Sequence, residues 1–102
     1  MILTILLAVQ TPSLADVETT ARTCLVQQAT KIAKGSKETA ETIFDVARNR
    51  CDEPIKSVGA RALVAEMQGN NYQYVRGASD RAITRFLADV RPAILDAIIT
   101  AR

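Results

Sequence analysis

Two cysteines, Cys24 and Cys51, carry the most informative chemistry in this sequence. An even number of cysteines is compatible with a disulfide. Their separation is far too large for a Cys-x-x-Cys redox pair, and the chain has no histidine to complete a standard zinc site with them. We therefore expect a structural disulfide. The alternative is two unpaired thiols buried in a core.

Few other residues suggest a reaction centre. The lack of histidine removes the commonest general base and the commonest metal ligand. The carboxylates of Asp52 and Glu53 are typical of a helix start rather than of an acid–base pair. Tyr72 and Tyr74, close to Arg76, are a candidate ligand contact, although such a segment more often covers a core. We expect no enzymatic activity, no cofactor and no metal site.

Two helices must position the cysteines. Apolar residues recur at helical spacing over 16–34, Gly35 is expected to end that helix, and Thr39 is a good N-cap for the next one. Folding the two helices antiparallel brings Cys24 level with Cys51 to within one residue, on the apolar face of each helix. The bond should stabilise the fold by about 3.5 kcal/mol in the chain-entropy treatment.

Pro54 predicts a break after the second helix, because an interior proline removes a hydrogen bond and clashes with the preceding turn. A third helix is then expected over about 54–68. Its Gly59 and Ala62 would allow another helix to approach closely. The full apolar face comprises Ile55, Val58, Gly59, Ala62 and Ala65.

The last helix, which we expect Ser79 or Asp80 to cap, has the clearest apolar face of the chain. Pro92 lies on its polar side, where a kink bends a helix around a core. The sequence therefore predicts an all-α fold, a small bundle of about four helices. The first two form a disulfide-pinned antiparallel hairpin, and the C-terminal helix is kinked. The last helix's face comprises Ile83, Phe86, Leu87, Val90, Ile94, Ala97 and Ile98.

Residues 1–15 predict a cleaved signal peptide, which would leave one helical domain over 16–102. The segment opens with an almost unbroken apolar run that is too short to span a bilayer but has the length of a signal-peptide apolar region. Small residues at Ser13 and Ala15 mark a cleavage point before Asp16. The alternative is a buried N-terminal strand or helix turn. Because a disulfide needs an oxidising compartment, both features predict a periplasmic or secreted protein.

The net charge and the apolar surface of the last helix indicate which classes of binding partner to expect. A net charge of +2 with both signs mixed is too weak to indicate a nucleic-acid partner. Ala88, Leu95 and Ile99 form a second apolar stripe on the last helix, a candidate interface with an unknown protein partner or in a homodimer. Alternatively, the kink or the Tyr72–Val75 segment buries them.

The functional interpretation is a small exported protein-interaction module. The rival is a protein that binds a membrane surface or an apolar ligand through its C-terminal amphipathic helix. The balanced charges on that helix disfavour the rival, because membrane-surface helices usually carry a cationic polar face. No integral membrane segment is expected after the signal peptide is removed.

Overall fold

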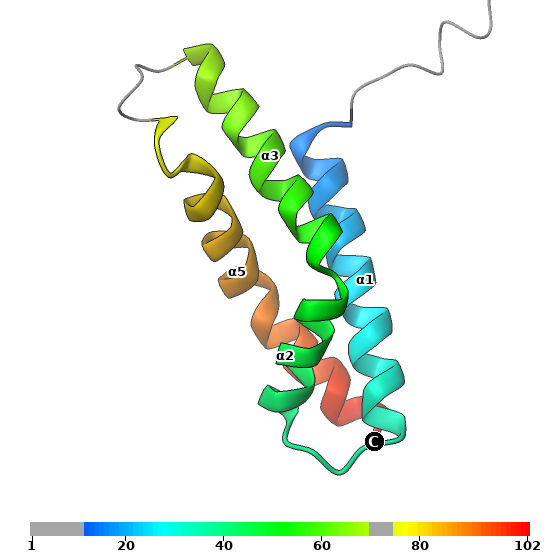
Figure 1. Ribbon diagram of the computed structural model, residues 1–102. Coiled ribbons are helices and arrows are strands. Elements are labelled where there is room, and N and C mark those ends of the chain that lie inside the picture. Colours follow the sequence, from blue (N-terminus) through cyan, green and yellow to red (C-terminus); the bar gives the residue numbers. More distant parts are fainter. Residues whose placement is uncertain (1–11, 70–74) are drawn as a thin grey trace, which may run out of the picture.

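The computed structural model describes residues 12–69 and 75–102. Within these ranges the segments with helical periodicity form four α-helices. Figure 1 shows α1 running down the molecule, α2 and α3 returning beside it, and α5 running down again. The predicted all-α bundle with a disulfide-pinned first hairpin is confirmed. Within the described ranges the helices are α1 (Leu14–Lys34), α2 (Ala40–Arg50), α3 (Asp52–Gly69) and α5 (Ala78–Ala101).

α1 begins two residues earlier than predicted, because Ser13 caps it. The backbone N–H of Asp16 donates to Ser13 Oγ at 3.1 Å, and the Ser13 N–H donates to Asp16 Oδ2 at 3.2 Å. This reciprocal pair satisfies two amides that have no partner within the helix. The predicted cleavage point, between Ala15 and Asp16, therefore lies in the first turn of α1. Lys31 and Lys34 lie in the last turn of α1, where their positive charges are favoured by the negative end of the helix dipole.

α2 and α3 are two parts of one interrupted helix. Thr39 caps α2 as predicted, accepting the N–H of Thr42 at 3.2 Å. The break falls at Cys51, the C-cap of α2, and α3 starts at Asp52 rather than near Pro54. Pro54 is thus the third residue of α3, where a backbone N–H would have no partner within the helix. The proline is accommodated because the helix restarts just before it.

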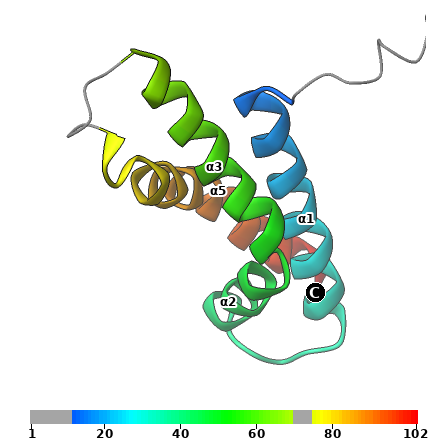
Figure 2. The same ribbon diagram turned by 45° about the horizontal axis from the view of Figure 1, so that its top comes forward.

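The core combines rows of buried residues spaced four apart on α1 and α5 with buried residues of α2 and α3. Packing between rows of residues spaced four apart favours helices that cross at about 50°. Figures 1 and 2 show α5 crossing obliquely past α1. Pro92 lies inside this helix, and the kink at Pro92 stays a prediction. The buried rows are Ala21, Leu25, Ala29 and Ala33 on α1, and Phe86, Val90, Ile94 and Ile98 on α5.

The close approach predicted for Gly59 is confirmed. A Cβ at this position would clash with Ser79 Oγ and lie 2.8 Å from Ile83 Cδ1. Because real Cβ atoms essentially never come so close, any side chain at position 59 would require Ser79 and Ile83 of α5 to shift. Ala65, the last residue of the predicted α3 face, is exposed. The other four residues of that face are buried.

The predicted cap of the last helix is wrong. α5 begins at Ala78, and its N-cap is Gly77, with φ of +78° and no side-chain hydrogen bond. Glycine adopts this left-handed conformation without the steric cost of a side chain. The N–H of Arg81 donates to the Gly77 carbonyl at 2.9 Å and closes the first turn. Ser79 is instead half-buried against α3.

Candidate functional site

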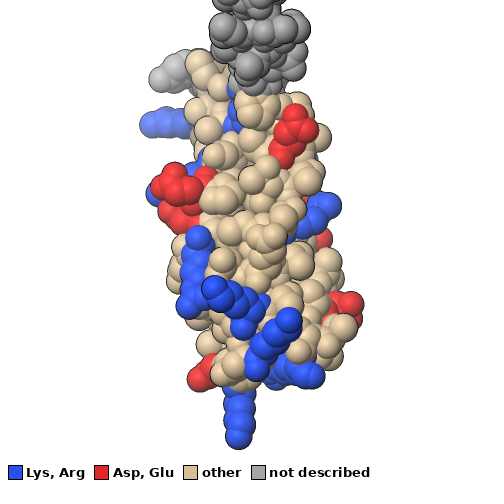
Figure 3. Space-filling view, turned by 90° about the vertical axis from the view of Figure 1, so that its right-hand side faces the viewer, with Lys and Arg blue, Asp and Glu red and all other residues tan. Residues whose placement is uncertain are grey.

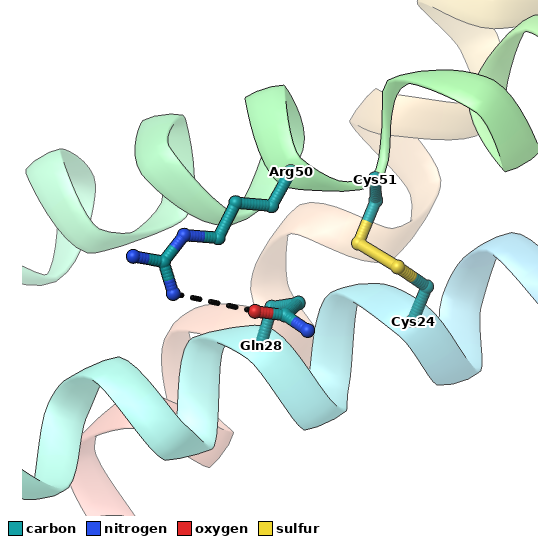
Figure 4. Close-up of a disulfide and its surroundings, with 4 residues drawn as sticks. All are labelled: Cys24, Gln28, Arg50 and Cys51. Carbon is teal, nitrogen blue, oxygen red and sulfur yellow. Dashed lines mark hydrogen bonds between the residues drawn. A yellow bond between two sulfur atoms is a disulfide. The ribbon is translucent and has the colours of Figure 1, made fainter.

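The predicted bond between Cys24 and Cys51 is present and joins α1 to the point where α2 gives way to α3 (Figure 4). The two Cα atoms lie 5.9 Å apart. Cys51 is fully buried and Cys24 is half-buried. Beside the bond, Arg50 Nη1 donates to Gln28 Oε1 at 3.4 Å, which partners a polar residue on the otherwise apolar face of α1. The disulfide therefore fixes the hairpin.

The structure tests only part of the predicted tyrosine site. Tyr72 and Tyr74 lie outside the described residues. Arg76 is exposed, and its backbone carbonyl accepts a hydrogen bond from Arg81 Nη1 at 2.9 Å. The three residues thus remain a predicted ligand contact.

The three residues of the candidate interface lie in different environments. Ala88 is exposed. Leu95 is half-buried and packs against the core, whereas 65% of Ile99 is accessible to solvent. Ile99 has the largest exposed fraction among the large apolar side chains that are exposed in the described part of the chain. Ala88 and Ile99 are thus exposed while Leu95 packs on the core, and the three residues remain a predicted interface. Ile99 is its most exposed large apolar side chain.

Arg91, one turn before Leu95, is held against α2. Its Nη2 lies 2.8 Å from Glu41 Oε2, and its guanidinium carbon lies 5.2 Å from the centre of the Phe44 ring. The ion pair and the cation–π contact fix a long side chain that would otherwise be free to move. Arg91 thus presents a guanidinium group that is already ordered.

Arg102 makes a second connection at the other end of this surface. Its Nη2 donates to the backbone carbonyl of Glu38, just before α2. Leu95 and Ile99 follow Arg91 at helical spacing along α5, and Arg102 is the residue that caps this helix. Arg91 and Arg102 contact the start of α2 and the residue before its cap, and Ile99 lies exposed between them in sequence. We call Arg91, Leu95, Ile99 and the adjoining Glu41 the α2–α5 surface.

Sequence reasoning missed Arg91. Its spacing from Leu95 and Ile99 was visible, and an arginine one turn before an apolar pair is a usable signal. Its contacts with Glu41 and Phe44 depend on how α5 crosses α2. The sequence pattern does not fix that crossing.

No metal centre emerges among the described residues, where no group of three or more acidic or cysteine side chains could hold an ion. None of the described helices is long and apolar enough to cross a membrane. Comparison of the chain with protein-family models, curated proteins and solved structures finds no match. The candidate site is accordingly defined by surface chemistry.

Proposed function

We propose that this protein is a small exported module that works by protein–protein contact, and that it pairs with a second copy of itself through the α2–α5 surface. The observation that carries the proposal is Ile99, an isoleucine that is 65% exposed between ordered polar groups. Burying such a side chain in an interface gains about 1.5–3 kcal/mol. Preorganised neighbours reduce the entropy lost on association.

The charges around Ile99 support a second copy as the partner. In a two-fold interface the same patch occurs on both chains, so it must be complementary to itself. Arg91 lies on α5 and Arg102 caps it, and the carboxylates of Glu38 and Glu41 lie at the start of α2. A two-fold axis close to Ile99 lets the arginines of one chain approach the carboxylates of the other.

The burial of α5 weighs against the rival membrane-surface interpretation. The apolar row of α5, Phe86 to Ile98, is inside the bundle, so a lipid surface could reach it only if the helix left the core. Ile99 alone offers too little apolar area for an interfacial helix. The rival therefore requires partial unfolding, which the proposed pairing does not.

Ile99→Asp should abolish pairing. It would place a charge at the centre of the contact while leaving the core intact, so light scattering should give a dimer mass for the wild type and a monomer mass for the variant. Thr100→Asp is the matched control, because Thr100 is exposed and this substitution adds the same charge one residue away. Leu95 is left unchanged because it packs on the core.

Circular dichroism should show the same helix content in both variants and the wild type. If Ile99→Asp retained the dimer mass, the α2–α5 surface would not be the interface. If Thr100→Asp dissociated the dimer equally, the effect would be general charge repulsion rather than loss of the Ile99 contact.

A further inference from the structure

The end of the bundle where α1 stops concentrates positive charge. Figure 3 shows Lys and Arg side chains gathered mainly over the lower half of the face drawn there. A shallow depression, wide open to solvent, lies at this end of the fold. It is lined by Ala33, Lys34, Ser36, Lys37 and Arg102.

Three separate segments bring the cations of this depression together. Lys34 belongs to the last turn of α1, which ends where the Gly35 N–H donates to the carbonyl of Ile32 at 3.1 Å. Lys37 follows in the connection to α2. That connection is shaped by Ser36, whose Oγ accepts the N–H of Glu38 at 3.0 Å.

Arg102 completes the depression from the end of α5. Its Nη2 is anchored on the Glu38 carbonyl, which leaves its other N–H groups available to a ligand. The Ser36 hydroxyl accepts from the backbone and keeps its own proton for donation. One anchored guanidinium, two ammonium groups and one hydroxyl therefore line the same hollow.

The local charge balance remains positive. Lys31, one turn before Lys34, adds a fourth exposed cation. Two negative groups reduce this positive charge: the Glu38 carboxylate and the partial negative charge at the end of α1. A free α-carboxylate at Arg102 would be a third. Four side-chain cations against one side-chain carboxylate, within 31–38 and at 102, leave a net attraction for anions.

We propose that this depression binds a phosphate group. Guanidinium and ammonium groups together match the tetrahedral oxygens of phosphate, which accept several charge-assisted hydrogen bonds at once. The same chemistry is offered by free phosphate and by the headgroup of an anionic phospholipid.

Titration with inorganic phosphate, followed by amide NMR shifts at constant ionic strength, tests the site. Saturable shifts are expected at residues 34–38 and 102, with no response to chloride. Lys34→Gln with Lys37→Gln should weaken binding at least tenfold. Both lysines are exposed, so the fold should persist, as circular dichroism will verify.

Lys56→Gln is the control for the general loss of positive charge. Lys56 Nζ lies 2.9 Å from Asp52 Oδ2, and this hydrogen bond and charge raise the pKa of the ammonium group. Lys56 is therefore a fully charged lysine outside the depression, and its removal should leave phosphate binding unchanged.

A second arm separates the two sources of phosphate. Sedimentation with phosphatidylglycerol vesicles, compared with phosphatidylcholine vesicles, reports a headgroup site if binding disappears in the double lysine variant. Saturable shifts with inorganic phosphate alone indicate a small anion instead. The proposal is overturned if neither ligand binds, if chloride gives the same shifts, or if the double variant binds like Lys56→Gln.

Discussion

Cys24 and Cys51 form one bond but occupy different environments, since Cys51 is fully buried and Cys24 is half-buried. Loss of either sulfur opens a loop with a sequence separation of 27 residues. In the chain-entropy treatment that loop contributes about 3.5 kcal/mol to the free energy of unfolding. Beyond the stability that both variants lose with the bond, the burial of each position determines how far its replacement lowers the free energy of unfolding.

Cys51→Ser should therefore destabilise the fold more than Cys24→Ser. Both variants lose the bond, but only the hydroxyl at position 51 is placed at a fully buried site, which costs about 1–3 kcal/mol when it finds no partner. Urea unfolding of both variants, with reductant present to prevent intermolecular bonds, measures the difference. Equal unfolding midpoints would show that position 51 is less buried than the structure has it.

The pairing of α3 with α5 depends on a glycine. Gly59→Ala should lower the free energy of unfolding by about 1–3 kcal/mol, because overpacking outweighs the better helix propensity of alanine. Gly35→Ala is the control, since nothing lies within 4 Å of a Cβ there and its φ of −115° suits any residue. Thermal unfolding compares the two. A Gly59→Ala protein as stable as Gly35→Ala would contradict the close packing of α3 on α5.

The helices could be predicted from local sequence patterns. The wrongly predicted helix ends lie where two local patterns point to different structures. Thr39 capped α2 as predicted because a cap is a contact between near neighbours. The signal-peptide pattern ends beyond Ser13, and it competes with the capping pattern of Ser13 and Asp16 that the structure shows. Gly77 was missed because the prediction sought a side-chain cap, whereas this turn needs a left-handed residue.

The candidate site was less predictable than the helices. The cysteine pair could be placed by register alone, because both residues lie on one hairpin. Ile99 could be predicted as exposed because it lies off the main apolar face. The fixing of Arg91 by Glu41 and Phe44, and the meeting of Lys34 with Arg102, depend on tertiary crossing.

At the scale of the whole molecule, the proposed export predicts a defined mature chain. Expressed with residues 1–15 in a diderm bacterium, the protein should be recovered from the periplasm beginning at Asp16, with no free thiol. The physical basis is the short apolar run followed by small residues at the cleavage point. Removal of Ser13 costs α1 its cap, but Asp16 keeps a negative charge at the positive helix end.

The intact mass of the periplasmic product tests both the predicted start at Asp16 and the predicted absence of free thiols. A cytoplasmic product that retains Met1 to Ala15 would contradict export. Two titratable thiols in a correctly exported product would contradict the disulfide while leaving export standing. A disulfide-linked dimer would show that the cysteines pair between chains.

The folded protein is proposed to pair with a second copy of itself through the α2–α5 surface. Sedimentation velocity of the mature wild type over a wide dilution series tests this pairing most directly. We expect the sedimentation coefficient to rise with concentration from the monomer value to a dimer plateau, because a small interface gives a concentration-dependent dimer. A single monomer coefficient at every concentration would contradict it.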